Sequence, residues 1–149
     1  MTLPAVACTA AHLAGSFAAV RGSAGAGNIV YALTLRNTSP RTCFVTGIPG
    51  VVLLDAHGRP LPTHTRAVQP GALTAVRVDL APGRAARATA RFSPDVPGPG
   101  EPVLGRQCEP TAHALRVSPS GGGTLRVSIR EPTPVCEHGT MTWTVLTRS

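Results

Sequence analysis

Glycine and proline interrupt this chain from one end to the other. Sixteen Gly and fifteen Pro are spread over its 149 residues. Such frequent interruption leaves little room for long helices and favours many short strands joined by turns. The length fits one domain with a real core, and a hydrophobic content of 42% with 14% charged residues is typical of a globular chain.

Apolar and polar residues alternate with a period of two in several segments. Tyr31, Leu33 and Leu35, for example, are separated by Ala32 and Thr34, as in a strand with one buried face. Similar patterns or short apolar runs occur at 43–45, 51–54, 76–80, 86–92, 115–117, 125–130 and 140–145. We therefore expect an all-β, immunoglobulin-like antiparallel β-sandwich of about eight or nine short strands, forming a single domain over residues 1–149.

Three local features complete this picture. The alanine-rich segment from Thr9 to Val20 is the one place where a short helix could form. Residues 55–59 predict a hairpin turn, because Asp55 can accept from its own backbone and Gly58 can take a positive φ. Trp143 stands on the apolar face of the last strand, where a lone Trp is usually part of the core.

The four cysteines predict two disulfides. They are isolated from one another, so no C-x-x-C motif occurs, and three pairings are formally possible. We favour Cys8–Cys43 and Cys108–Cys136, because each bond then ties neighbouring segments within one half of the chain. Each would contribute roughly 3–4 kcal/mol in the chain-entropy model. Two disulfides also indicate an oxidising, extracellular compartment.

Metal ligation is the alternative use of these cysteines. Five His accompany them, and Cys136 and His138 are only two residues apart. No paired ligand spacing recurs, however, as a structural zinc site would require. We therefore expect neither a metal site nor a cofactor.

The basic charge does not predict a nucleic-acid partner. The formal net charge is +7, all fourteen basic residues are Arg, and they are scattered singly. A nucleic-acid surface usually groups its basic residues and adds stacking aromatics, whereas this chain has one Trp, one Tyr and three Phe. An Arg-only, Ala-, Gly- and Pro-rich composition instead reflects G+C-rich codons on a solvated basic surface.

Several motifs together resemble a known family. They are Leu-Arg-Asn-Thr-Ser at 35–39 followed by Cys43, Gly-Ile-Pro-Gly-Val at 47–51, and Leu-Ala-Pro-Gly at 80–83, placed between the outer cysteines. In this arrangement the chain resembles the four-cysteine domain of secreted and lipid-anchored actinobacterial proteins, catalogued as domain of unknown function 4232. The resemblance spans nearly the whole chain and implies a sandwich, two disulfides and export. It brings no catalytic residues, and the proline-rich segment 94–102 departs from it.

The beginning of the chain carries no complete export signal. Residues 1–8 lack a charged n-region and an apolar h-region, and no apolar run reaches the roughly 20 residues of a membrane helix. We expect a secreted or cell-surface bacterial protein whose signal peptide is missing, with Met1 in its place. The Ala-Val-Ala-Cys stretch ending at Cys8 leaves an upstream lipid anchor open as an alternative.

Motifs for catalysis are lacking. No G-x-S-x-G elbow occurs, and the glycines of 22–27 lack the GK[ST] ending of a phosphate loop. The seven acidic residues are widely separated, which argues against paired carboxylates, although two could meet in space: Asp55, Asp79, Asp95, Glu101, Glu109, Glu131 and Glu137. We predict that the chain is not an enzyme.

The remaining prediction is an extracellular binding or structural module of the cell envelope or secretome, which contacts another extracellular protein or an envelope component. Rigid scaffolds commonly carry their function on loops, and a proline-rich loop loses little entropy on binding. The candidate contact residues are Pro94, Asp95, Pro97, Pro99, Glu101 and Pro102. An edge strand is a second candidate surface. A secreted hydrolase inhibitor and an envelope carrier of small molecules or metals are the alternatives.

Overall fold

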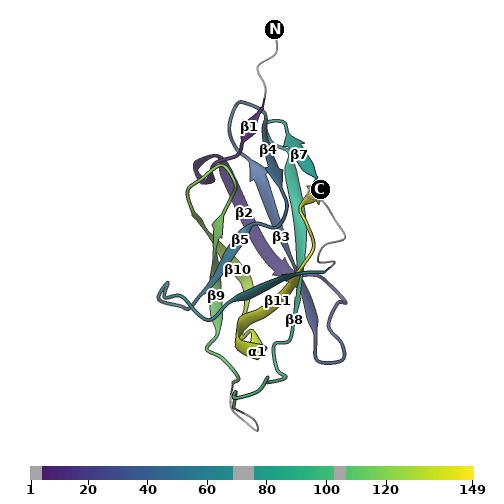
Figure 1. Cartoon of the computed structure of the whole chain (residues 1–149), viewed down its shortest axis with the longest axis vertical. Coiled ribbons are helices and arrows are strands. Elements are labelled where there is room, and N and C mark those ends of the chain that lie inside the picture. Colours follow the sequence, from purple (N-terminus) through teal and green to yellow (C-terminus); the bar gives the residue numbers. More distant parts are fainter. Residues whose placement is uncertain (1–4, 69–75, 103–106) are drawn as a thin grey trace.

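The computed structural model describes residues 5–68, 76–102 and 107–149 and shows an all-β sandwich (Figure 1). The strands fall into a three-stranded and a nine-stranded sheet. The elements are β1 (Val6–Ala7), η1 (Ala10–His12), β2 (Leu13–Ala19), β3 (Ile29–Asn37), β4 (Cys43–Thr46), β5 (Gly50–Leu54), β6 (His64–Ala67), β7 (Arg77–Leu80), β8 (Ala85–Phe92), β9 (Ala112–Ser118), β10 (Leu125–Thr133), α1 (Cys136–Gly139), β11 (Thr140–Trp143) and β12 (Thr147–Arg148).

The larger sheet supplies both layers of the sandwich. Its strand order is β5-β9-β10-β2-β3-β8-β11-β6, and β12 pairs with β8 outside this path. Strand β2 joins the layers, because it pairs with β3 on one side and with β10 on the other. Side chains of both layers meet in one core cluster, with Leu33 and Ala88 from one and Leu115 and Val127 from the other.

The smaller sheet, in the order β1-β4-β7, lies at the end of the molecule from which the N-terminus extends (Figure 1). Segment α1 and the proline-rich loop lie at the opposite end (Figure 1). The smaller sheet and α1 are therefore separated by the length of the sandwich (Figure 1).

The predicted alternation is confirmed along β8. Its even-numbered residues Ala86, Ala88 and Ala90 are buried, whereas Arg87 and Arg91 are exposed. Small alanines on this strand leave room for the large side chains of its neighbour β3, with which it pairs from end to end. This packing explains how an alanine-rich strand forms the middle of a dense core.

Aromatic side chains fill the centre of the sandwich. The ring of Phe17 lies 5.2 Å from that of Tyr31 and 5.9 Å from that of Trp143, and Tyr31 lies 5.0 Å from Phe92. Trp143 is fully buried. The prediction that it belongs to the core is confirmed.

The strands are not all antiparallel. Three pairs are parallel, namely β1 with β4, β2 with β10 and β6 with β11. Each of these joins segments remote in the sequence, so no hairpin signal announces them. The described residues also form twelve strands rather than eight or nine, since several are very short.

The segment from Thr9 to Val20, where a short helix could form, is mostly strand. Only the 3₁₀ turn η1 is helical there, and the rest is strand β2, which pairs with β3 over its full length. Leu13 and Phe17 are the buried residues of β2. A spacing of four places two residues on one face of a strand as well as of a helix, so the pattern was ambiguous and strand pairing decided it.

Both predicted disulfides are confirmed. Cys8 bonds Cys43 and Cys108 bonds Cys136, across sequence separations of 35 and 28 residues. The first bond ties β1 to β4, and the second ties the segment before β9 to α1. With its sulfur bonded to Cys43, Cys8 has no thiol for a lipid thioether. Within the described ranges, no helix has the length and apolarity needed to cross a membrane.

The turn at 55–59 is confirmed as well. Asp55 Oδ1 accepts from the backbone N–H groups of His57 at 2.8 Å and Arg59 at 2.9 Å. Gly58 has φ +79°, a conformation that glycine adopts without strain.

Candidate functional site

A left-handed turn follows the second disulfide. Segment α1 places Glu137 at φ 58° and His138 at φ 57°, and Gly139 continues at φ 77°. For residues other than glycine this conformation costs about 1–2 kcal/mol each. Successive left-handed residues aim their backbone N–H groups into one concavity, which attracts an anion.

The carboxylate of Glu101 fills that concavity. Oε1 accepts from the N–H groups of Glu137 at 2.6 Å and Gly98 at 2.7 Å, and Oε2 accepts from that of His138 at 2.9 Å. The side chain is 1% exposed. These bonds stabilise the strained turn and fasten the proline-rich loop to it.

The structure therefore separates the predicted contact residues into two groups. Glu101 is buried as an internal anchor and is not a surface residue, because its carboxylate satisfies backbone donors on both sides. Asp95, Pro99 and Pro102 are exposed, and Pro94 and Pro97 are half-buried. Whether this loop contacts a partner stays a prediction.

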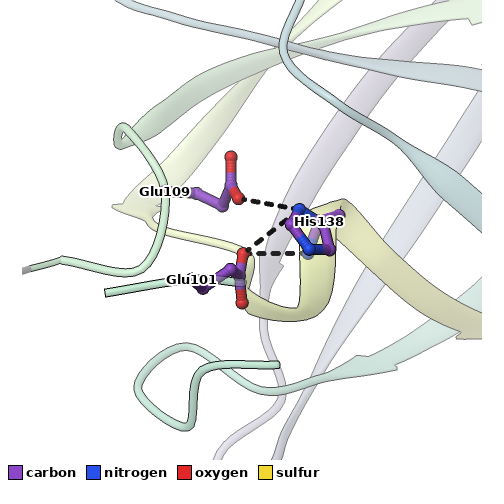
Figure 2. A group of neighbouring side chains, drawn as sticks. All are labelled: Glu101, Glu109 and His138. Carbon is purple, nitrogen blue, oxygen red and sulfur yellow. Dashed lines mark hydrogen bonds and ion pairs between the residues drawn. The ribbon is translucent and has the colours of Figure 1, made fainter. Parts of the chain in front are cut away.

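Two further side chains converge on Glu101 (Figure 2). His138 Nδ1 lies 3.5 Å from Glu109 Oε2 and 4.0 Å from Glu101 Oε2. One ligand atom from each residue lies within 4.8 Å of the other two. The ring of His138 is held on its other side, where Nε2 lies 2.8 Å from the carbonyl oxygen of Pro99. We call Glu101, Glu109 and His138 the acidic–histidine cluster.

The surroundings lower the pKa of the Glu101 carboxyl group and raise that of Glu109. Burial alone would raise the pKa of Glu101, but hydrogen bonds from Glu109 and from the backbone of Gly98, His138 and Glu137 lower it to about 2. Burial, reinforced by the hydrogen bond to Glu101 and by its charge, raises the pKa of Glu109 to about 7 against the opposing effect of His138. The pKa of His138 is raised, first by the hydrogen bond to Pro99 and further by both carboxylates. Glu101 thus carries the permanent negative charge of the cluster.

An open groove of about 660 Å³ borders the cluster. Its lining comes from two regions: Thr63 with His64, Thr65 and Arg66 of β6, and Pro99 with Glu137, His138 and Thr140. Strand β6 is the last strand of its sheet and pairs with β11 in parallel register. His64, Thr65 and Arg66 are all exposed there. The groove therefore lies beside the paired starts of β6 and β11 and is lined by basic and hydroxyl side chains.

This cluster is not apparent from the sequence, which predicts no metal site and argues against paired carboxylates. In the structure Glu101 and Glu109 nevertheless lie close together. The signal that could have found the cluster is its position next to two cysteines. Glu109 follows Cys108 directly and His138 lies two residues after Cys136, so the bond between these cysteines brings both side chains together.

Comparison with known proteins gives one match. The model of the family described as Domain of unknown function (DUF4232) matches residues 8–147. No curated protein and no solved structure matches the chain.

Proposed function

The chain belongs to this family of unknown function, and from its geometry we propose that it is an exported, non-catalytic binding module. Its partner is another extracellular protein of the bacterial envelope or secretome. The module binds an extended, acidic segment of that partner along strand β6. Two disulfides support the exported location, because such bonds persist in oxidising compartments.

The observation that carries the proposal is the position of β6. Among the described residues it pairs with β11 alone, and its other edge carries backbone donors and acceptors that a further strand can pair with. Addition of an extended peptide to such an edge is a common recognition mode. The adjoining groove gives room for the side chains of that peptide.

Charge indicates the composition of the peptide. His64, Arg66 and His138 line the groove, opposed by Glu137, and the whole chain carries a formal charge of +7. An acidic peptide is therefore steered toward the groove and discriminated from a basic one, in a manner that salt weakens.

The test measures binding of fluorescent extended peptides by polarisation, comparing acidic with basic sequences of equal length. We expect the acidic set to contain binders whose affinity falls by about tenfold or more in the Arg66→Glu variant. Arg116→Glu is the matched control, because Arg116 is an exposed arginine on β9, outside the groove. Backbone N-methylation of a bound peptide at alternate positions should abolish binding, because it removes strand-pairing donors.

Two results would contradict the proposal of peptide binding along β6. One is the absence of any acidic binder at millimolar concentration. The other is binding that Arg66→Glu and N-methylation leave unchanged, which would place the contact elsewhere on the basic surface.

A secreted hydrolase inhibitor is the second candidate, supported by the loop that begins after β8. The loop is fastened at Glu101 and at Pro99, yet Val96 is 48% exposed. A rigid loop with an exposed apolar residue resembles what a protease-inhibiting loop requires. Inhibition of a member of a protease panel, lost in Val96→Asp, would support this candidate, and no inhibition across the panel would remove it.

A further inference from the structure

We propose that the acidic–histidine cluster is a binding site for a divalent metal ion of the zinc type. The ligand atoms are Glu101 Oε2, Glu109 Oε2 and His138 Nδ1. The site shares His138 with the groove beside β6 but does not require a bound peptide. It departs from the sequence-based prediction that the chain holds no metal.

The cluster brings one ring nitrogen and two carboxylate oxygens together. His138 Nε2 lies 2.8 Å from the carbonyl oxygen of Pro99. A carbonyl oxygen only accepts, so Nε2 carries a hydrogen and donates it. In the neutral ring Nδ1 then carries a lone pair, which faces the carboxylate oxygens of Glu109 at 3.5 Å and Glu101 at 4.0 Å. With both carboxylates ionised and the ring neutral, three acceptors face one another, and a metal ion satisfies all three at once.

Within the described residues, the two buried carboxylates have no arginine as a counter-charge. Buried carboxylates are normally paired with a cation or coordinate a metal. The side chains of Glu101 and Glu109 are 1% and 13% exposed. Among the residues that the structure places, no arginine lies within 4.0 Å of either carboxylate, and His138 is the one cationic group that does. None of the thirteen arginines that the structure describes pairs with these carboxylates, and the one basic side chain that reaches them is that of His138.

Each of the three ligand residues is held in place by its surroundings. Histidines that bind metals usually donate their second ring N–H to a carbonyl or carboxylate, which fixes the ring and the tautomer, and Pro99 provides such a carbonyl. Glu101 is oriented by three backbone donors, of which only one reaches Oε2, so this oxygen keeps a lone pair for a metal. The disulfide Cys108–Cys136 holds Glu109 and His138 on adjoining segments. The ligands are therefore positioned before a metal arrives.

The donor set and the dimensions fit zinc. Imidazole nitrogen with carboxylate oxygen suits Zn²⁺, which binds each at about 2.0–2.2 Å, so that its ligands lie roughly 3.3–3.6 Å apart in a tetrahedron. The separation of 3.5 Å between Glu109 and His138 already falls in this range. The separation of 4.0 Å between Glu101 and His138 and that between the two carboxylates, which is at most 4.8 Å, must close by up to about 1.5 Å. His138 is half exposed and lines the groove. Three protein ligands leave the fourth position to water or to a group of a bound partner.

The experiment titrates ZnCl₂ into the oxidised, chelator-treated full chain and follows the heat of binding and the melting temperature. We expect one equivalent of Zn²⁺ to bind and to raise the melting temperature. Glu109→Gln and His138→Asn should each weaken binding by at least about tenfold. Both variants preserve shape, and Asn tolerates the left-handed backbone of position 138. His57→Asn, in the exposed hairpin turn, is the matched control and should bind zinc as the unaltered chain does.

A spectroscopic measurement separates loss of the site from loss of the fold. In a long-range ¹H–¹⁵N spectrum of the histidine rings, Zn²⁺ should shift the Nδ1 resonance of His138 and leave those of the other four histidines in place. The proposal is overturned if no binding occurs at millimolar zinc. It is equally overturned if the shifted nitrogen belongs to another histidine, or if Glu109→Gln and His138→Asn bind as tightly as the unaltered chain.

Discussion

Glu101 and His138 are linked by two hydrogen bonds, each between a side chain of one segment and the backbone of the other. The carboxylate of Glu101 accepts the N–H of His138 at 2.9 Å, and the ring of His138 returns a hydrogen bond of 2.8 Å to the carbonyl of Pro99, two residues before Glu101. Two segments separated by more than thirty residues are thus fastened by contacts in both directions. This relationship fixes the end of the sandwich at which we place both proposed sites.

The first prediction concerns the anchoring carboxylate. Glu101→Gln should lower the free energy of unfolding by about 1.5–3 kcal/mol, because a neutral amide replaces charge-assisted hydrogen bonds and turns an NH₂ group toward backbone donors. Urea denaturation followed by Trp143 fluorescence measures the change. Asp95→Asn is the control, since Asp95 is an exposed carboxylate of the same loop, and it should stay within about 0.5 kcal/mol. Equal effects of the two substitutions would show that Glu101 is not an anchor.

The second prediction concerns the pH dependence of the metal-free protein. The pKa of Glu109 is raised from its ordinary value of 4.5 to about 7. Its contribution to stability is therefore complete below pH 4.5 and is lost as the pH rises through 7. The raised pKa of His138 acts in the same direction. The pKa of Glu101 is lowered to about 2, so its contribution is complete above pH 4.5 and is lost as the pH falls toward 2.

These opposite dependences predict that the cluster stabilises the fold most near pH 4.5. Melting temperatures measured between pH 3 and 8 with a chelator present will test this. Glu109→Gln mimics the protonated side chain, so the decline between pH 4.5 and 7 should become shallower in this variant. Parallel curves for the variant and the unaltered chain would contradict the assignment of the raised pKa to Glu109.

The third prediction compares two glycines with nearly equal backbone angles. Gly139 has φ +77° and Gly58 has φ +79°. A β-carbon at Gly58 meets no atom within 4 Å, whereas one at Gly139 collides with the carbonyl oxygen of Pro62. Gly58→Ala should therefore cost about 1–2 kcal/mol for the left-handed backbone alone.

Gly139→Ala should cost clearly more than that, because the chain before β6 must also move away from β11. Urea denaturation of the two variants gives the comparison. The peptide affinity of Gly139→Ala should fall as well, since β6 carries the proposed docking edge. Equal losses in the free energy of unfolding would show that the close approach to Pro62 does not add to the cost at Gly139.

The overall architecture could be predicted from the sequence because its signals are local. Alternation such as that of Tyr31, Leu33 and Leu35 decides which face of a strand is buried, and this does not depend on distant residues. Nearness in the sequence also favoured the two disulfides that the structure contains. The parallel pairs were not predictable, because β6 and β11, for example, are separated by about half of the chain.

The acidic–histidine cluster was not predictable for a related reason. Glu101, Glu109 and His138 follow no periodic spacing, and their meeting depends on a left-handed turn at Glu137 and His138. Glutamate does not favour that conformation, although histidine adopts it more often than most residues. It is held by the carboxylate of Glu101 and by the adjacent disulfide, both of which are tertiary contacts. Once Cys108 is paired with Cys136, the positions of Glu109 and His138 beside these cysteines do indicate that they lie close together.

The last prediction separates the roles of the two disulfides. Their loops span 35 and 28 residues, so replacing either pair with serine should lower the free energy of unfolding by about 3–4 kcal/mol. The functional effects should differ, because Cys8–Cys43 ties β1 to β4 at the far end from the cluster, whereas Cys108–Cys136 adjoins both Glu109 and His138. Cys108→Ser with Cys136→Ser should therefore weaken zinc binding strongly, and Cys8→Ser with Cys43→Ser should leave it unchanged in the fraction that remains folded. Calorimetric titration below the melting temperature of each variant makes the comparison. If both pairs weaken zinc binding alike, the second disulfide does not position the ligands, and binding follows the overall stability of the sandwich.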